Sequence, residues 1–272
     1  MYKLKNGLFA RLILFALLVA GFGQGAAFAQ SRNDKSAQGQ TPVKLLVAAA
    51  ASLKNAYDKE LIPLFQKKYS WISVEGTYDS SGKLQSQIES GLPADVFMSA
   101  APAQMNALVG KNLVSKKSVK SILENRIVLI KTAGTNTPVT SFKNITAAPV
   151  IAIGDPASVP AGQYAKEVFE SLKIWDAVKS KASLGTNVTE VLKWVGEGSA
   201  SVGVVYATDA ASTNKVSIIA EAPAGSLKQK VLYPAGVVTA SAHEKEARMF
   251  VDFLASEEAL SVFQKYGFSK VK

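Results

Sequence analysis

Cysteine is absent from the 272 residues, and histidine occurs once. A chain without cysteine forms no disulfide and offers no thiol nucleophile or thiolate metal ligand. It also lacks the residue that would carry a lipid at an export cleavage site. The single histidine, His243, stands among charged residues in SAHEKEARMF, where we expect an exposed helix start.

Motifs of nucleophilic, metal-dependent and nucleotide-dependent enzymes are missing as well. A Ser-His-Asp site needs a strained serine elbow, but G-x-S-x-G does not occur. HEKEA lacks the second histidine of a zincin, and SSGKL lacks the earlier glycine of a Walker loop. We therefore predict no catalytic residue and no cofactor. An exported hydrolase on an α/β fold is kept as a less favoured alternative.

Basic residues outnumber acidic ones by 31 to 21, but they form no long run. The lysines are scattered, and no basic stretch is interleaved with aromatic residues. This pattern argues against a nucleic-acid partner and fits a solubilising surface, while leaving room for small anions.

A long apolar run occurs at residues 12–22, after a basic start, and Ala27-Phe28-Ala29 follows. This is the pattern of a secretory signal peptide over residues 1–29. A membrane anchor is the alternative, but the run is shorter than the roughly 20 residues that span a bilayer. Residues 30–41 are polar and aperiodic, so we predict a disordered lead-in. The expected location is the periplasm, with the protein soluble and without a lipid anchor.

Strand-like and helical patterns alternate through the rest of the chain, which predicts an α/β fold with mostly parallel strands. No internal repeat or flexible linker interrupts them. Apolar runs predict strands at 43–51, 71–78, 94–100, 125–132, 149–155, 200–207, 216–222 and 231–240. Helical patterns occur at 53–69, 81–89, 102–109, 162–178, 189–195 and 243–266, with Pro63 expected to kink or divide the first.

Several of the predicted helices begin with small or capping residues. Their N-termini leave backbone N–H groups unpaired and carry partial positive charge, so converging ends could bind an oxyanion without a cation. Taken singly, each is explained by ordinary capping. The positions are Ser52, then Ser80, Ser81 and Gly82, then Pro160, Ala161 and Gly162, and finally Asn187 and Val188.

Five stretches carry a resemblance to a known family: VAAAASLKNAYDKELIPLF, YDSSGKLQSQIESGLPADVFMSA, GDPASVPAGQYAKEVFESL, GVVYATDA and FQKYGF. They occur in matching order over residues 43–268, and GLPADVFMSA and GDPASVPAGQYAKE are quite specific. The chain resembles the periplasmic molybdate-binding proteins of ABC transporters.

The resemblance implies a two-lobed periplasmic binding fold of the second type. Each lobe would be a mainly parallel sheet flanked by helices, and the lobes would close by hinge bending around a ligand in the cleft. Lobe 1 would comprise residues 42–124 and 235–272, and lobe 2 residues 125–234. The crossovers would fall near residues 124–126 and 233–235.

The resemblance also implies a ligand set. Hydroxyl donors would be Ser52, Ser81 and Tyr206, and amide donors Ala161 and Val188. Molybdenum would be present only as the oxyanion that these residues hold. Ser81 is chosen over Ser80 by alignment alone.

Ligand chemistry narrows the choice further. Molybdate is fully deprotonated at neutral pH and only accepts hydrogen bonds. Phosphate keeps a proton, so a phosphate site is expected to include a hydrogen-bond acceptor. The five residues include no carboxylate, and we expect neighbouring Asp79 to point away or to cap its helix from outside. Tungstate would bind similarly, and another oxyanion such as sulfate is the alternative ligand. The implied partners are an ABC permease with its ATPase, and a monomer is expected.

Overall fold

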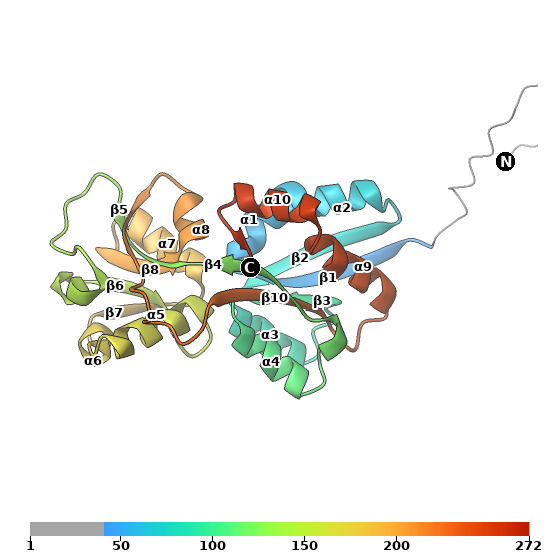
Figure 1. Cartoon of the computed structure of the whole chain (residues 1–272), viewed down its shortest axis with the longest axis horizontal. Helices are drawn as coiled ribbons and strands as arrows, with labels where there is room; N and C mark the ends of the chain where they lie inside the picture. The colour runs from blue at the N-terminus through green and yellow to red at the C-terminus, as the bar shows by residue number, and fades with distance from the viewer. Residues whose placement is uncertain (1–40, 272) are drawn as a thin grey trace, which may run out of the picture. The chain divides into compact units, whose positions relative to one another are not determined.

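A computed structural model describes residues 41–271, all of which belong to the unit Gln40–Lys272 (Figure 1). The predicted signal peptide and residues 30–40 of the predicted lead-in lie outside the described residues. Within residues 41–271, no helix combines the length and the apolar character needed to cross a membrane.

The first sheet has six strands in the order β11-β4-β10-β3-β1-β2. Strand β1 lies parallel to β2 and β3, whereas β10 is antiparallel to β3 and β4, and β11 is antiparallel to β4. The bounds are β1 Val43–Ala50, β2 Ile72–Asp79, β3 Val96–Met98, β4 Lys120–Asn125, β10 Val231–Val237 and β11 Ser269–Lys270.

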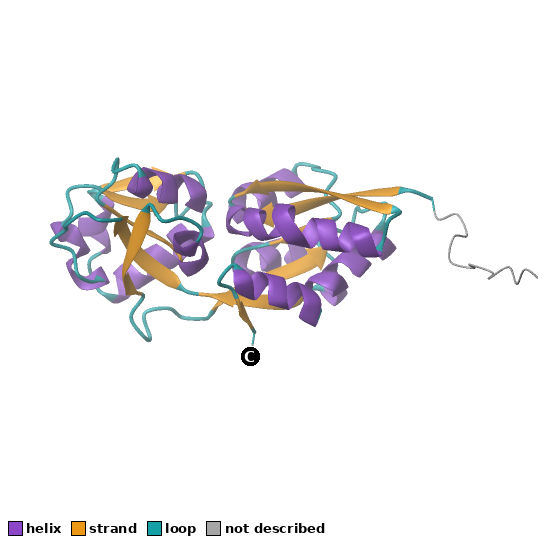
Figure 2. Cartoon of the chain, turned by 90° about the horizontal axis from the view of Figure 1, so that it is seen from above, coloured by secondary structure: helices purple, strands orange, loops and turns teal. Residues whose placement is uncertain are grey.

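Alternation along β1 explains how both faces of this sheet are buried. Ala48 packs with Leu84 and Leu108 in one core, while Val47 and Ala49 belong to the other. The first core lies under α3 (Ser81–Glu89) and α4 (Pro102–Gly110). The second contains residues of α9 (Glu244–Leu254) and α10 (Glu257–Lys265), so helices cover both faces (Figure 2).

The helical stretch after β1 changes its winding three times. A 3₁₀ turn, Ala51–Leu53, leads into α1 (Lys54–Ala56), a π-helical segment (Tyr57–Leu61) and α2 (Ile62–Lys68). Pro63 is the second residue of α2, two positions after the end of the π-helical segment. A proline ring clashes with the carbonyl four residues earlier in a regular α-helix, and the wider turn relieves that clash.

The second sheet has five strands in the order β7-β6-β8-β5-β9. Strand β6 is parallel to β7 and β8, and β5 is antiparallel to β8 and β9. The strands are β5 Ile127–Thr132, β6 Ile151–Gly154, β7 Ala182–Gly185, β8 Val202–Tyr206 and β9 Val216–Glu221. Their helices are α5 Pro160–Ser171, α6 Trp175–Lys179, α7 Val188–Gly196 and α8 Ala207–Ala211; short 3₁₀ segments occupy Lys116–Ser118 and Phe142–Ala147.

Helix α5 approaches the second sheet unusually closely. A Cβ placed on Gly162 would lie 1.9 Å from the carbonyl oxygen of Gly154 in β6. Only a residue without a side chain fits there, and this contact fixes where α5 begins relative to the end of β6.

Two connections join the sheets. Arg126 alone separates β4 from β5, and residues 222–230 lead from β9 back to β10. All of β10, from Val231 onward, lies in the first sheet. The lobe boundaries given above stay a prediction. The α/β class and the two flanked sheets are confirmed. The expectation of mainly parallel strands is wrong: five of the nine strand pairings among residues 41–271 are antiparallel, because the strands next to the two connections, β4 with β10 and β5 with β9, run in opposite directions.

Candidate functional site

A small cavity lies where the ends of β1 and β2 face the starts of α5 and α7. Its volume is ≈ 10 Å³, about the space of one water molecule, so a larger ligand enters only if the walls of the cavity move apart. The lining includes all five residues named from the sequence, Ser52, Ser81, Ala161, Val188 and Tyr206. The others are Ala50, Ala51, Asp79, Ser80, Ala100, Val159 and Pro160.

Two serine hydroxyls approach the cavity from the first sheet. Ser52 lies in the 3₁₀ turn after β1, and its Oγ is 3.1 Å from the hydroxyl of Tyr233. Ser81, the first residue of α3, is fully buried, and its Oγ accepts a hydrogen bond from Ala100 N at 3.0 Å. Within residues 41–271 the hydroxyl of Ser81 donates to no other residue, so its proton is available to a ligand.

Ser80 and Asp79 border the same cavity in other roles. Ser80 is the N-cap of α3, and its Oγ accepts from Lys83 N at 3.4 Å. Asp79 Oδ1 accepts from Ser80 N at 2.8 Å and from Asn187 Nδ2 at 3.3 Å, and Oδ2 lies 3.5 Å from Lys83 Nζ. The carboxylate is thus held by donors on both of its oxygens, although it lines the cavity.

Helix starts supply the donors from the second sheet. Ala161 is the second residue of α5, after Pro160, and Val188 is the first of α7. Asn187 caps α7 by accepting a hydrogen bond from Glu190 N at 3.1 Å. First-turn amides have no carbonyl partner within their own helix, so those of Ala161 and Val188 can serve a ligand.

Tyr206 ends β8 and is nearly completely buried. Its hydroxyl donates to the carbonyl oxygen of Ala100 at 3.2 Å. Burial raises the pKa of the Tyr206 phenol well above its ordinary value, so it stays protonated and can donate. The carboxylate of Asp209 accepts from Tyr206 N at 3.1 Å, and burial raises the pKa of Asp209 to about 7.

Further hydrogen bonds join the two sides around the cavity. Gly82 N donates to Ser158 O at 2.9 Å, and Gln104 Nε2 donates to Gln163 Oε1 at 3.0 Å. With the Tyr206 bond, these contacts hold the helices of the first sheet against those of the second.

The lining is rich in neutral donors and holds no lysine, arginine or histidine; its one charged side chain is the carboxylate of Asp79, whose two oxygens already face donors. Among residues 41–271, no group of three or more histidine, cysteine, aspartate or glutamate residues is placed to hold a metal ion. One small space is instead surrounded by the starts of α3, α5 and α7 and by four hydroxyls, those of Ser52, Ser80, Ser81 and Tyr206. Such an arrangement is suited to an anion that only accepts hydrogen bonds.

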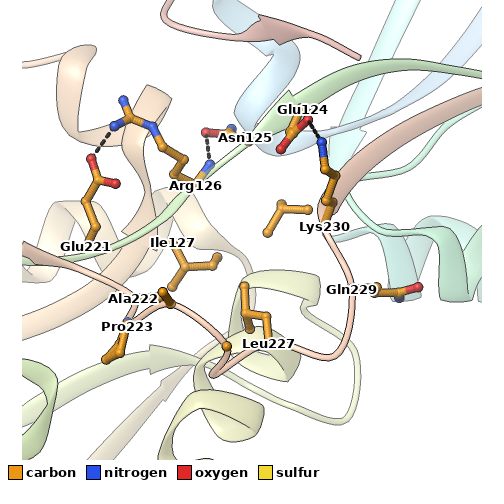
Figure 3. Close-up of a pocket in the computed structure, with 13 residues that line it drawn as sticks. Glu124, Asn125, Arg126, Ile127, Glu221, Ala222, Pro223, Leu227, Gln229 and Lys230 are labelled. Atoms are coloured by element: carbon orange, nitrogen blue, oxygen red, sulfur yellow. Dashed lines mark hydrogen bonds and ion pairs between the residues drawn. The ribbon is translucent and has the colours of Figure 1, made fainter. Parts of the chain in front are cut away.

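A larger cavity, ≈ 270 Å³, lies at the connections between the sheets (Figure 3). Arg126 pairs there with Glu221, and Lys230 Nζ lies 3.0 Å from Glu124 Oε2. Each cation is matched by a carboxylate, so this cavity offers an anion no surplus of positive charge.

Three supporting residues were not found from the sequence. Ala100 bonds to both Ser81 and Tyr206 through its backbone, and Tyr233 and Asn125 stand behind Ser52. Backbone groups leave no signature in a sequence, and Tyr233 lies within an apolar run that indicates only a strand.

Known proteins resemble the chain over nearly its whole length. YvgL of Bacillus subtilis, provisionally named an ABC transporter substrate-binding lipoprotein, is 40% identical over 99% of both chains. The molybdate-binding protein ModA of Haemophilus influenzae is 36% identical over 93% of this chain and 96% of its own. A solved substrate-binding domain from Clostridium difficile, provisionally assigned to a molybdenum ABC transporter, is 35% identical. It covers 85% of this chain and 100% of its own, with a TM-score of 0.65.

A family model describes the same relationship. The model for bacterial extracellular solute-binding proteins matches residues 45–269, which include both sheets except the final residue of β11 and the first two of β1. The chain therefore belongs to the bacterial extracellular solute-binding proteins.

Proposed function

We propose that the chain captures molybdate in this cavity and delivers it to the permease of an ABC transporter. The ATPase of the same transporter would drive transport through that permease. The observation that carries the proposal is the convergence of five neutral donors on one small cavity without a cationic side chain. The names of relatives that bind molybdate, and of a domain from a molybdenum transporter, support the same ligand.

In the proposed complex, the hydroxyls of Ser52, Ser81 and Tyr206 and the amides of Ala161 and Val188 donate to the four oxygens. Hydrogen bonds to a charged group contribute roughly 1.5–3 kcal/mol each. Five of them in a closed cleft are compatible with sub-micromolar affinity after the cost of association is met. Binding also requires the Tyr206 hydroxyl to turn from Ala100 O to the anion.

Tungstate has the same charge and nearly the same size as molybdate, so we propose that it binds as well. Sulfate shares the acceptor-only chemistry but is smaller, and it remains the alternative. No catalytic step is proposed, because the lining offers neither a histidine nor an activated nucleophile.

We further propose a monomer that acts in the periplasm without a lipid anchor. The absence of cysteine from the sequence supports the last of these points, because cysteine is the residue that would carry the lipid. In this respect we expect the chain to differ from YvgL, whose name describes a lipoprotein.

Calorimetric titration with molybdate, tungstate, sulfate and phosphate tests the proposed function. We expect tight binding of the first two anions, weak binding of sulfate and none of phosphate. If only sulfate gave a binding signal, the proposed ligand would be sulfate instead of molybdate. The absence of a response to both metal oxyanions would refute the proposal.

A further inference from the structure

A chain of buried polar groups runs from the connection between the sheets to the cavity. Asn125, the last residue of β4, contacts Tyr233 in β10, and Tyr233 contacts Ser52 at the cavity wall. Tyr233 is fully buried and Asn125 is 6% exposed. The direction in which these groups donate determines what Ser52 can offer a ligand.

The orientation of the Asn125 amide is fixed at both ends. Its Oδ1 accepts from Arg126 N at 2.8 Å, which Figure 3 shows as a dashed line. Its Nδ2 therefore faces Thr208 Oγ1 at 2.9 Å and the Tyr233 hydroxyl at 3.2 Å. The reversed amide would set its NH₂ group against the backbone N–H of Arg126, donor against donor.

The orientation of Asn125 sets that of Tyr233. An amide NH₂ only donates, so the phenol oxygen of Tyr233 accepts from Asn125 and must donate its own proton elsewhere. Ser52 Oγ, 3.1 Å away, is the acceptor in contact with it. Burial raises the pKa of the Tyr233 phenol well above its ordinary value, so the proton is present throughout the neutral range.

The packing around Tyr233 leaves its ring little freedom to turn. The ring lies edge-on to Tyr206, with centroids 5.6 Å apart, and to Phe268, with centroids 5.3 Å apart. Because Ser52 Oγ accepts from this fixed phenol, the proton of Ser52 has to point away from Tyr233, toward the cavity that Ser52 lines.

We propose that Asn125 and Tyr233 are positioning residues that hold the Ser52 hydroxyl as a donor toward the cavity, and so select ligands that only accept hydrogen bonds. This inference rests on the proposed function, because it assigns the preference for a fully deprotonated oxyanion to a specific chain of residues. A hydrogen phosphate would bring its own O–H against the Ser52 proton that points into the cavity, donor against donor. Ser81 is oriented in the same way, because its Oγ accepts a hydrogen bond from Ala100 N and its proton is left for the ligand.

A double-mutant cycle on Ser52 and Tyr233 tests the inference. Molybdate dissociation constants are measured by calorimetry for the wild type, Ser52→Ala, Tyr233→Phe and the double variant. We expect Tyr233→Phe to weaken binding about tenfold in the wild-type background and less than about twofold in the Ser52→Ala background, because Tyr233 acts through Ser52. Equal losses in both backgrounds, or no loss in the wild type, would overturn it.

Tyr57→Phe is the matched control. Tyr57 is a fully buried tyrosine of the same sheet's core whose hydroxyl donates to Met98 Sδ at 2.8 Å, away from the cavity lining. It should leave the molybdate dissociation constant unchanged. Circular dichroism and thermal unfolding establish that each variant is folded.

The ratio of molybdate affinity to phosphate affinity gives a second test, because a residue that only supports the fold would leave this ratio unchanged. In Tyr233→Phe the freed Ser52 hydroxyl can rotate and present a lone pair to the cavity, so the affinity ratio of molybdate to phosphate, measured by competition, should fall. If both affinities change in proportion, Tyr233 only supports the fold and the inference is wrong.

Should Tyr233→Phe not fold, Asn125→Ala tests the same chain from its other end, with the same expected dependence on Ser52. If the wild-type protein does not bind molybdate, the proposed function and this inference are both refuted. A wild type that binds molybdate, combined with an additive cycle, would refute the inference alone.

Discussion

The hydroxyl of Tyr206 donates to the carbonyl oxygen of Ala100, 3.2 Å away, and thereby links the second sheet to the loop after β3 of the first. The same hydroxyl is a proposed donor to the ligand. Tyr206 therefore has two competing partners, one in the protein and one in the cavity, and exchange between them would couple anion binding to the contact between the sheets.

Tyr206→Phe should weaken molybdate binding by roughly tenfold or more, because a charge-assisted hydrogen bond is lost in a buried cavity. Calorimetric titration measures the change. Tyr164→Phe is the matched control, since within residues 41–271 the buried Tyr164 hydroxyl has no hydrogen-bond partner. If both variants bind like the wild type, Tyr206 is not a ligand.

Ser81→Ala should reduce both affinity and stability. It removes a proposed ligand donor, and it leaves the buried Ala100 N–H without its acceptor, which costs about 1–3 kcal/mol. Urea unfolding gives the stability and calorimetry the affinity. Ser86→Ala, on the exposed side of the same helix, should alter neither quantity appreciably.

A stability loss in Ser81→Ala with unchanged molybdate affinity would move the ligand role to Ser80. The two neighbours both line the cavity, and Ser80 also keeps a hydroxyl proton free while it caps α3.

Gly162→Ala should destabilise the protein by more than about 3 kcal/mol. The added methyl group would meet the carbonyl of Gly154 at 1.9 Å, and neither backbone can move without displacing α5 or β6. Denaturant unfolding tests this, with Gly110→Ala in α4 as the control, since a Cβ there meets nothing within 4 Å. A Gly162→Ala variant as stable as the wild type would contradict the close packing.

Local sequence patterns predict a helix or strand well where capping or turn-forming residues mark both of its ends. The helix predicted at 81–89 is α3, Ser81–Glu89, because Ser80 caps it and apolar residues recur at helical spacing. The single helices predicted at 162–178 and 243–266 are each divided in two. Lys173 adopts the left-handed region (φ 59) between α5 and α6, and Ser256 caps α10 after α9. Neither break contains proline or glycine. The helical spacing of apolar residues therefore continues across each break, and the sequence predicts one helix where there are two.

The convergence of the site depends on sheet order, which no local pattern contains. Ser52 and Ser81 follow the adjacent parallel strands β1 and β2, so their proximity follows from one strand pairing. Ala161 and Val188 meet them only because the chain crosses into a second sheet and back. Tyr206 was found through the family resemblance, and Tyr233 by neither route, since a buried strand tyrosine is usually part of a core.

Asp209 should make the stability of the protein depend on pH. Its pKa is raised by burial from an ordinary 3.8 to about 7. Between these values the unfolded chain has lost the proton and the folded protein keeps it, so the folded state binds more protons there. The free energy of unfolding should therefore fall as pH rises from about 4 to about 7, by up to ~4 kcal/mol, and level off above.

Asp209→Asn isolates this effect, because the amide oxygen can still accept from Tyr206 N while the charge is gone. Urea unfolding of both proteins at pH 5, 6, 7 and 8 gives the difference in stability. The variant should gain on the wild type as the pH rises, since the wild type alone must keep a carboxylate in a buried site. A difference that is the same at all four values would mean that Asp209 is charged in the folded protein throughout this range, stabilised by its hydrogen bonds despite burial.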